Sequence, residues 1–147
     1  MSTSPTFSTQ LIGQTEKTLD AILDRLLAGT GLTEPQWVTL TLAVRSGGTL
    51  DPTRFISRVA DALKISDADA RARIDELAAA QLLVVPEGAG SPLGVTDAGR
   101  QLHARIRSAV VEITDRMWGD LPAADLAAAG RVLTTVLERA NAELARA

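Results

Sequence analysis

The fold is decided by residues 51–99, which read DPTRFISRVADALKISDADARARIDELAAAQLLVVPEGAGSPLGVTDAG. Asp51-Pro52 predicts a helix start, because Asp can accept hydrogen bonds from free N–H groups and Pro fits the first helical position. Apolar residues recur at helical spacing up to Leu63, and Lys64-Ile65-Ser66 predicts a turn. We expect Ser66 to cap a second helix. The inner stripe of that helix is predicted to be Ala70, Ile74 and Leu77.

A hairpin is predicted after these two helices. Residues 81–85 include an apolar run that is too short for a helix, and residues 86–92 contain two glycines and two prolines, which predict a loop. Leu93-Gly94-Val95 returns as a strand, and Thr96 is expected to cap the next helix. Two short helices, a tight turn and a hairpin make a winged helix-turn-helix, whose second helix usually enters the major groove of DNA.

Long helices are predicted on both sides of this lobe. The first runs from about Phe7 to Ala28, and a capping box at Thr33-Glu34-Pro35-Gln36 opens a shorter helix after it. Two more are predicted, from Thr96 to about Trp118 and from about Ala123 to the C-terminus. The long helices carry apolar stripes, which predicts either that they pack on each other in a monomer or that they share a partner.

The composition fits one compact domain and excludes several classes of protein. With 147 residues the chain can bury a core without disulfides or metal ions to stabilise it. Its lack of cysteine excludes disulfides, thiolate zinc sites and thiol-based redox sensing. Its single histidine argues against a histidine-rich metal sensor. No apolar stretch approaches the roughly 20 residues that span a bilayer, and no signal-peptide pattern is present. A cytoplasmic protein with no membrane partner is therefore expected.

The sequence resembles the MarR family of bacterial transcriptional regulators over nearly the whole chain. The matching stretches are Leu32–Trp37, Ile74–Leu77 with Leu82–Val84, and Val95–Gly99. The resemblance implies a mainly α fold in a single domain, 1–147, with a winged helix-turn-helix lobe at 31–96. Residues 6–30 and 97–147 would form a helical dimerisation region. A homodimer would present two recognition helices to successive major grooves of a pseudo-palindromic, double-stranded operator.

The second helix of the motif supplies the expected DNA-binding residues. If the apolar stripe faces the core, then Asp69, Ala72 and Glu76 face outward, with arginines on the flanks. Ala72 stands where the family commonly has an outward arginine, and the wing at 86–93 has no basic residue. The expected DNA-binding set is Ser66, Asp69, Arg71, Ala72 and Arg73.

The charge of the lobe leaves two functions open. Residues 54–99 hold five basic and seven acidic side chains, a net charge of −2, and the whole chain has −3. Affinity for DNA comes largely from neutralising phosphates, so this balance disfavours tight binding. The first reading is a transcriptional regulator that a small-molecule effector releases from its operator. The alternative is a MarR-like dimeric ligand-binding or interaction module with weak or lost operator binding.

A crevice for a small anionic or aromatic effector is also implied by the resemblance. Trp37, His103 and Arg107 are placed to line it, although the simpler interpretation makes Trp37 a core residue and His103 a partly exposed helical residue. No catalytic residue is expected, because there is no cysteine nucleophile and no glycine-framed serine. Asp67 and Asp69 are read as structural acids that interact with the helix dipole. We therefore expect no enzyme, no metal site and no cofactor.

Overall fold

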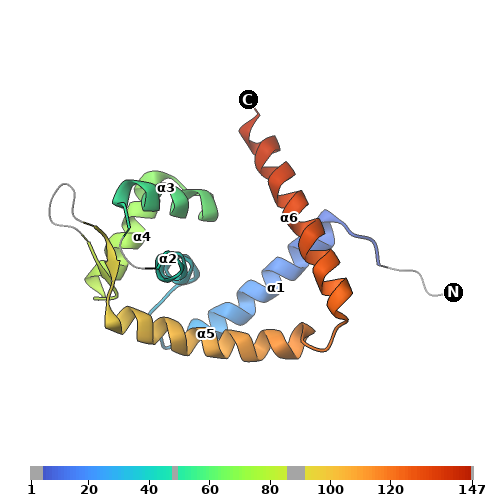
Figure 1. Cartoon of the computed structure of the whole chain (residues 1–147), viewed down its shortest axis with the longest axis horizontal. Coiled ribbons are helices and arrows are strands. Elements are labelled where there is room, and N and C mark those ends of the chain that lie inside the picture. The colour runs from blue at the N-terminus through green and yellow to red at the C-terminus, as the bar shows by residue number, and fades with distance from the viewer. Residues whose placement is uncertain (1–4, 48–49, 86–91, 147) are drawn as a thin grey trace. The chain divides into compact units, whose positions relative to one another are not determined.

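A computed structural model describes residues 5–47, 50–85 and 92–146, and within these ranges it is mainly α-helical, as predicted (Figure 1). The elements are α1 (Thr9–Leu27), α2 (Glu34–Arg45), α3 (Pro52–Leu63), α4 (Asp67–Ala79), β1 (Leu83–Val84), β2 (Gly94–Val95), α5 (Asp97–Trp118) and α6 (Ala123–Ala145). The chain divides into two compact units, Met1–Val110 and Val111–Ala147, with the boundary inside α5. The predicted limits of the lobe and of the dimerisation region stay predictions.

Three of the predicted helix caps are confirmed. Thr33 and Gln36 form both bonds of the capping box at the start of α2. The Ser66 hydroxyl accepts a hydrogen bond of 3.1 Å from the backbone N–H three residues later, at the start of α4. Thr96 does the same for α5 at 2.9 Å. These side chains satisfy backbone donors that would otherwise lack a partner, so the helices begin where the sequence predicts.

The predicted side-chain cap at Asp51 is wrong. Asp51 occupies the N-cap position of α3, but its side chain makes no capping hydrogen bond. Its carboxylate instead lies 3.9 Å from the Arg54 guanidinium, which competes for the same oxygens. Pro52 does occupy the first turn of α3 as predicted, and the helix ends at Lys64 in the left-handed conformation (φ 57°).

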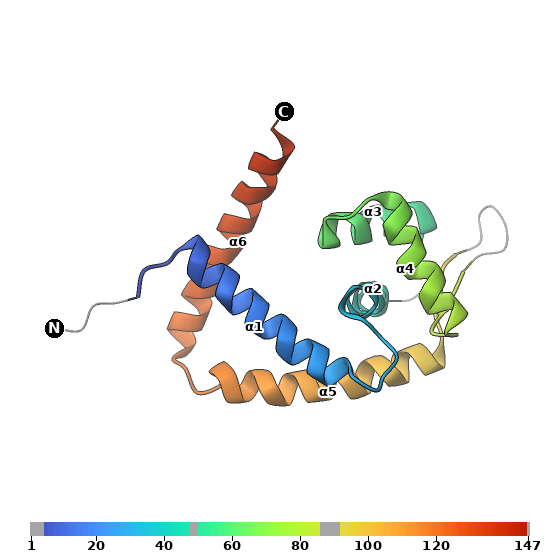
Figure 2. The ribbon, with the colours of Figure 1, turned by 180° about the vertical axis from the view of Figure 1, so that it is seen from behind.

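The core of the first unit surrounds α2. Figures 1 and 2 both show α2 end-on, with α3, α4 and the hairpin around it. The predicted inner stripe of α4, Ala70, Ile74 and Leu77, is buried. Leu40 on α2 and Val59 on α3 are fully buried against the same core. Burial of this stripe fixes which flank of α4 remains outside.

The wing is antiparallel, with Leu83 opposite Val95 and Val84 opposite Gly94. Leu50 extends it through two backbone hydrogen bonds with Leu93, of 2.9 and 3.0 Å, which the sequence did not indicate. The loop predicted at 86–92 lies, apart from its last residue, outside the described residues, as does much of the wing at 86–93.

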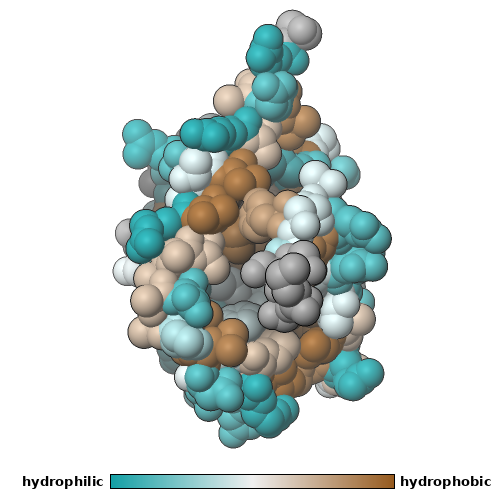
Figure 3. Space-filling model, turned by 90° about the vertical axis from the view of Figure 1, so that its right-hand side faces the viewer, coloured by the Kyte–Doolittle hydropathy of each residue, from teal (hydrophilic) through white to brown (hydrophobic). Residues whose placement is uncertain are grey.

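The second unit is rich in exposed apolar side chains. In a single chain, none of the residues described in α6 is buried. Figure 3 shows brown, apolar side chains exposed at the surface on one face of the molecule. The exposed large apolar residues of this unit are Val111, Met117, Trp118, Leu121, Val132, Leu133, Val136, Leu137 and Leu144. Among the described residues, no helix is long and apolar enough to cross a membrane.

Candidate DNA interface and ligand crevice

The expected DNA-binding residues differ in how far they reach solvent. Asp69 and Arg71 are exposed on α4, as is Ser66, whose hydroxyl is engaged in the cap. Ala72 and Arg73 are only partly exposed. The structure therefore places all five at the start of α4 or along it, with Arg71 and Arg73 on opposite flanks, and Arg71 is the more exposed of the two arginines.

Arg73 is paired within the lobe. Its Nε lies 2.8 Å from Glu76 Oε1, and its Nη2 donates a hydrogen bond of 3.0 Å to Glu76 Oε2. Gln36 Nε2 on α2 donates to the same Oε1 at 3.0 Å. The hydrogen bond from Gln36 is the largest cause that lowers the pKa of the Glu76 carboxyl, and the hydrogen bond from Arg73 is the next. Glu76 is thus exposed on the outer side of α4, as expected, and it is also hydrogen-bonded to α2.

Arg71 lines an open pocket of about 270 Å³. The pocket is formed by the start of α3, by α4 and by the base of the wing, and it includes Thr53, Asp75 and Val85. Among the described residues, Arg71 takes part in none of the ion pairs. Its guanidinium is therefore available to a phosphate or to a base edge.

A second open pocket, of about 300 Å³, lies where the end of α2 meets α3. Arg54 and Arg58, one turn apart on α3, line it together with Ser46. Arg58 Nη1 donates a hydrogen bond of 3.2 Å to the Ser46 hydroxyl. Their spacing of four residues places both arginines on one face of α3, a signal in the sequence from which only their charge was used above.

The predicted crevice residues Trp37 and His103 are in contact. Their rings stack with centroids 4.8 Å apart and an interplanar angle of 18°. The reading of His103 as partly exposed is wrong, because only 6% of its surface is accessible. Trp37 is half-buried and packs against the core. The stack joins α2 to α5 inside the first unit.

The environment of His103 disfavours its protonated form. Burial lowers the pKa of the imidazole, and the positive charges of Arg107 and Arg45 lower the pKa further. The buried Nε2 has no hydrogen-bonding partner among the described residues. Both arginines are exposed. Arg107 was predicted to lie here, whereas Arg45, which comes from the far end of α2, carries no local signal in the sequence.

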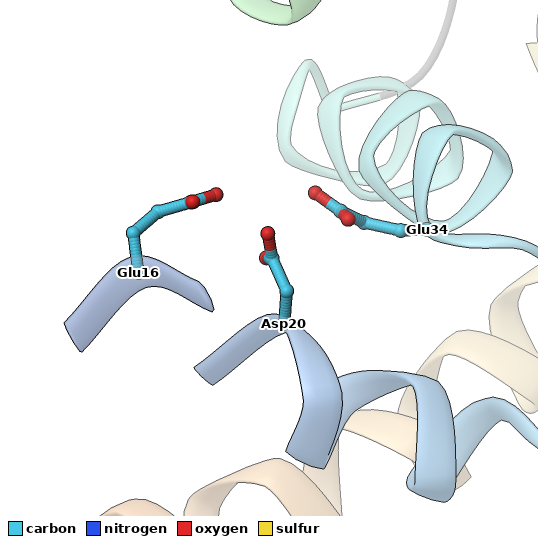
Figure 4. A group of neighbouring side chains, drawn as sticks. All are labelled: Glu16, Asp20 and Glu34. Carbon is cyan, nitrogen blue, oxygen red and sulfur yellow. The ribbon is translucent and has the colours of Figure 1, made fainter. Parts of the chain in front are cut away.

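Three carboxylates gather at another place, where α1 meets the start of α2. Figure 4 shows Glu16, Asp20 and Glu34 pointing toward one another, and one oxygen of each lies within 4.8 Å of the others. A hydrogen bond with Asp20 raises the pKa of Glu16. The pKa of Glu34 is raised mainly by burial, and also by the negative charges of Asp20 and Asp24. Protonation relieves this repulsion, which is why both pKa values lie above the ordinary value. The expectation of no metal site stays a prediction.

Comparisons with known proteins give a match in structure alone. No protein-family model matches the sequence, and no curated protein matches it. Solved structures of MarR family regulators match across most of the chain. The chain has the MarR fold. S. aureus MepR in complex with DNA matches with a TM-score of 0.73 at 18% identity, over 92% of this chain and 99% of that one.

Two other MarR-fold structures are relevant to the site. A MarR family protein of Mycobacterium tuberculosis in complex with DNA matches with a TM-score of 0.67 at 21% identity, over 90% of this chain and 98% of that one. Bordetella bronchiseptica BpsR, whose DNA binding is regulated by 6-hydroxynicotinic acid, matches with a TM-score of 0.69 at 25% identity. That match covers 86% of this chain and 96% of BpsR.

Proposed function

We propose that the protein is a homodimeric, DNA-binding transcriptional regulator that a small aromatic or anionic effector releases from its operator. The observation that carries the proposal is the flank of α4 beside its buried stripe, where Arg71 is exposed and lines an open pocket. A helix held in this way by its apolar stripe can enter a major groove as a rigid unit. The MarR-fold proteins that were solved with DNA support this use of the fold.

The Trp37–His103 stack is the proposed effector site. An aromatic stack supplies an apolar surface, and Arg45 and Arg107 supply positive charge beside it. This combination suits a small aromatic carboxylate, because such pockets are apolar with a few polar groups that fix orientation. In BpsR a compound of that class, 6-hydroxynicotinic acid, regulates DNA binding. The effector would favour a dimer whose recognition helices no longer match half-sites about one helical turn apart.

The exposed apolar side chains of α6 support a homodimer. Leu133 and Leu137 lie one turn apart on the same side of the helix. In a single chain they are 47% and 58% exposed. Burial of apolar area is the main driving force of association, so a second copy would cover this face. A two-fold dimer also presents two copies of α4 to one operator.

A MarR-fold interaction module is the second candidate, and one observation favours it. The lobe is net acidic over residues 54–99, and Glu76 neutralises one of the two arginines on α4. With fewer unpaired basic side chains, the protein would neutralise fewer phosphates and would bind DNA more weakly. In that case the crevice and the dimer would remain, without an operator.

A DNA-binding titration separates the two functions. The protein is titrated with the intergenic duplex upstream of its own gene and with a random duplex of equal length, at two salt concentrations. The regulator should prefer the intergenic duplex, and Arg71→Ala should reduce the salt slope by about one, as loss of one phosphate contact does. Lys17→Ala on α1 is the charge-matched control and should leave the slope unchanged. No preference over the random duplex at low salt would favour the interaction module.

A further inference from the structure

The Arg73 side chain is held on the flank of α4 by two residues from different helices. Glu76 Oε2 accepts a hydrogen bond of 3.0 Å from Nη2 of its guanidinium, and Glu76 Oε1 forms an ion pair with Nε at 2.8 Å, although Nε makes no hydrogen bond among the described residues. Gln36 fixes that carboxylate from α2, at 3.0 Å. The Arg73 side chain is 30% exposed and that of Glu76 is 41% exposed, so the pair lies at the edge of the lobe rather than in open solvent.

Gln36 is itself held in place. Its Oε1 accepts a hydrogen bond of 3.0 Å from the backbone N–H of Thr33 in the capping box, which leaves Nε2 to reach Glu76. The next residue along α2 is Trp37, which stacks on His103. The contact therefore ties α4 to the turn of α2 that carries the proposed effector site.

This arrangement takes Arg73 away from DNA. An arginine reads guanine, or clamps a phosphate, through two parallel N–H donors. In Arg73 the Nη2 donor is already bonded to Glu76, the buried Nε lies 2.8 Å from the same carboxylate, and that carboxylate offsets the positive charge that would attract a phosphate. Arg73 can bind DNA through these donors only after it leaves Glu76.

We propose that Gln36 and Glu76 form a latch that withholds Arg73 from DNA, so that the affinity and specificity of α4 depend on its contact with α2. Glu76 and Gln36 are positioning residues in this proposal, and Arg73 is the residue that would contact DNA. The inference rests on the proposed function as a DNA-binding regulator. It adds a built-in restraint on the recognition helix and names the residues that supply it.

The test is Glu76→Gln, an isosteric change that removes the charge of the latch. DNA affinity and its salt slope are measured for the wild-type dimer, Glu76→Gln, Arg73→Ala and the double variant, with both the intergenic and the random duplex. Asp67→Asn is the matched control, because it removes the same charge from the first turn of the same helix, where the carboxylate is exposed and forms no ion pair among the described residues. Thermal melts confirm that each variant is folded, and Glu76→Ala replaces Glu76→Gln if the latter is not.

Release of Arg73 should tighten binding about tenfold, the order expected for one new bidentate contact, and should steepen the salt slope by about one. The gain should disappear in the double variant. Equal tightening by Asp67→Asn, tightening that survives Arg73→Ala, or no tightening by Glu76→Gln would each overturn the latch while the regulator function stands. If neither the wild type nor any variant binds either duplex at low salt, the proposed regulator function is overturned, and the latch falls with it.

Discussion

The indole of Trp37 and the imidazole of His103 stack at a centroid distance of 4.8 Å, which makes the single histidine of the chain part of the contact between α2 and α5. Aromatic pairs of this kind contribute about 0.5–1.5 kcal/mol beyond the area they bury. The imidazole is 6% exposed and its Nε2 has no partner among the described residues, so the stack favours a neutral ring. Stability and ligand binding should both depend on the charge of this group.

Acidification should remove part of the stability through His103. Burial, Arg107 and Arg45 hold the pKa of His103 below its ordinary value of 6.5 in the folded chain. Between the two values the unfolded chain binds more protons, so the free energy of unfolding rises with pH. The contribution is present above about pH 6.5 and is lost as the pH falls from there through the folded pKa.

Denaturant unfolding of the wild type and of His103→Phe, compared across this pH range, measures the effect. Phe keeps a stacking ring and cannot be protonated, so the variant should lack this part of the pH dependence. As the pH falls, its free energy of unfolding should therefore decrease less than that of the wild type. Because both proteins share the acidic cluster at Glu16, Asp20 and Glu34, its titration cancels in the difference. If the free energies of unfolding of the two proteins change with pH in parallel, the lowered pKa of His103 is contradicted.

Binding of an aromatic carboxylate should depend on Arg107. Salicylate is the probe, and Trp37 fluorescence is the signal, recorded in a Trp118→Phe background because the chain has two tryptophans. Arg107→Ala should weaken binding about tenfold, as loss of a charged hydrogen bond of about 1.5–3 kcal/mol implies. Arg105→Ala, which removes the same charge two residues away, on another side of α5, is the control. An equal effect of both variants, or no change in fluorescence, would contradict the crevice.

Gly99 should not tolerate a side chain. A Cβ at this position of α5 would overlap the backbone oxygen of Leu82 and lie 3.0 Å from Val95 Cγ1, so α5 could no longer approach the wing as closely. Gly99→Ala should therefore lower the free energy of unfolding by about 1–3 kcal/mol. Gly13→Ala on α1 is the control, because its Cβ meets nothing within 4 Å and alanine favours the helix by about 0.5–1 kcal/mol. Thermal melts of both variants should shift in opposite directions, and a shared direction would contradict the close approach.

The helix starts and the buried stripe of α4 were predictable because their causes are local. The capping box at Thr33 and the cap at Ser66 need only neighbours along the chain, and helical periodicity alone indicates that Ile74 faces inward. The missing cap at Asp51 shows the limit of this reasoning, since a nearby Arg54 competes for the same carboxylate. Propensity ranks a residue for a position but does not decide between two local partners.

The candidate site was less predictable because its partners lie far apart in the sequence. The spacing of Arg73 and Glu76 permits an ion pair, but nothing local shows that Gln36 completes it. The burial of His103 likewise depends on Trp37, which comes from another helix. Arg45 joins this group through the packing of α2, and its own neighbours in the sequence gave no sign of it.

The apolar side chains of α6 should make the protein an obligate homodimer. Light scattering coupled to size exclusion should report about twice the chain mass at micromolar concentration. Leu133→Asp combined with Leu137→Asp should shift the protein toward monomers, because two carboxylates would have to be desolvated in the interface. Thr135→Asp, on the opposite side of the helix, adds a charge without entering that face and should leave the dimer intact. A wild-type chain that is folded and monomeric at this concentration would contradict the dimer, and so would dissociation of the Thr135 variant to the same extent as the leucine variant.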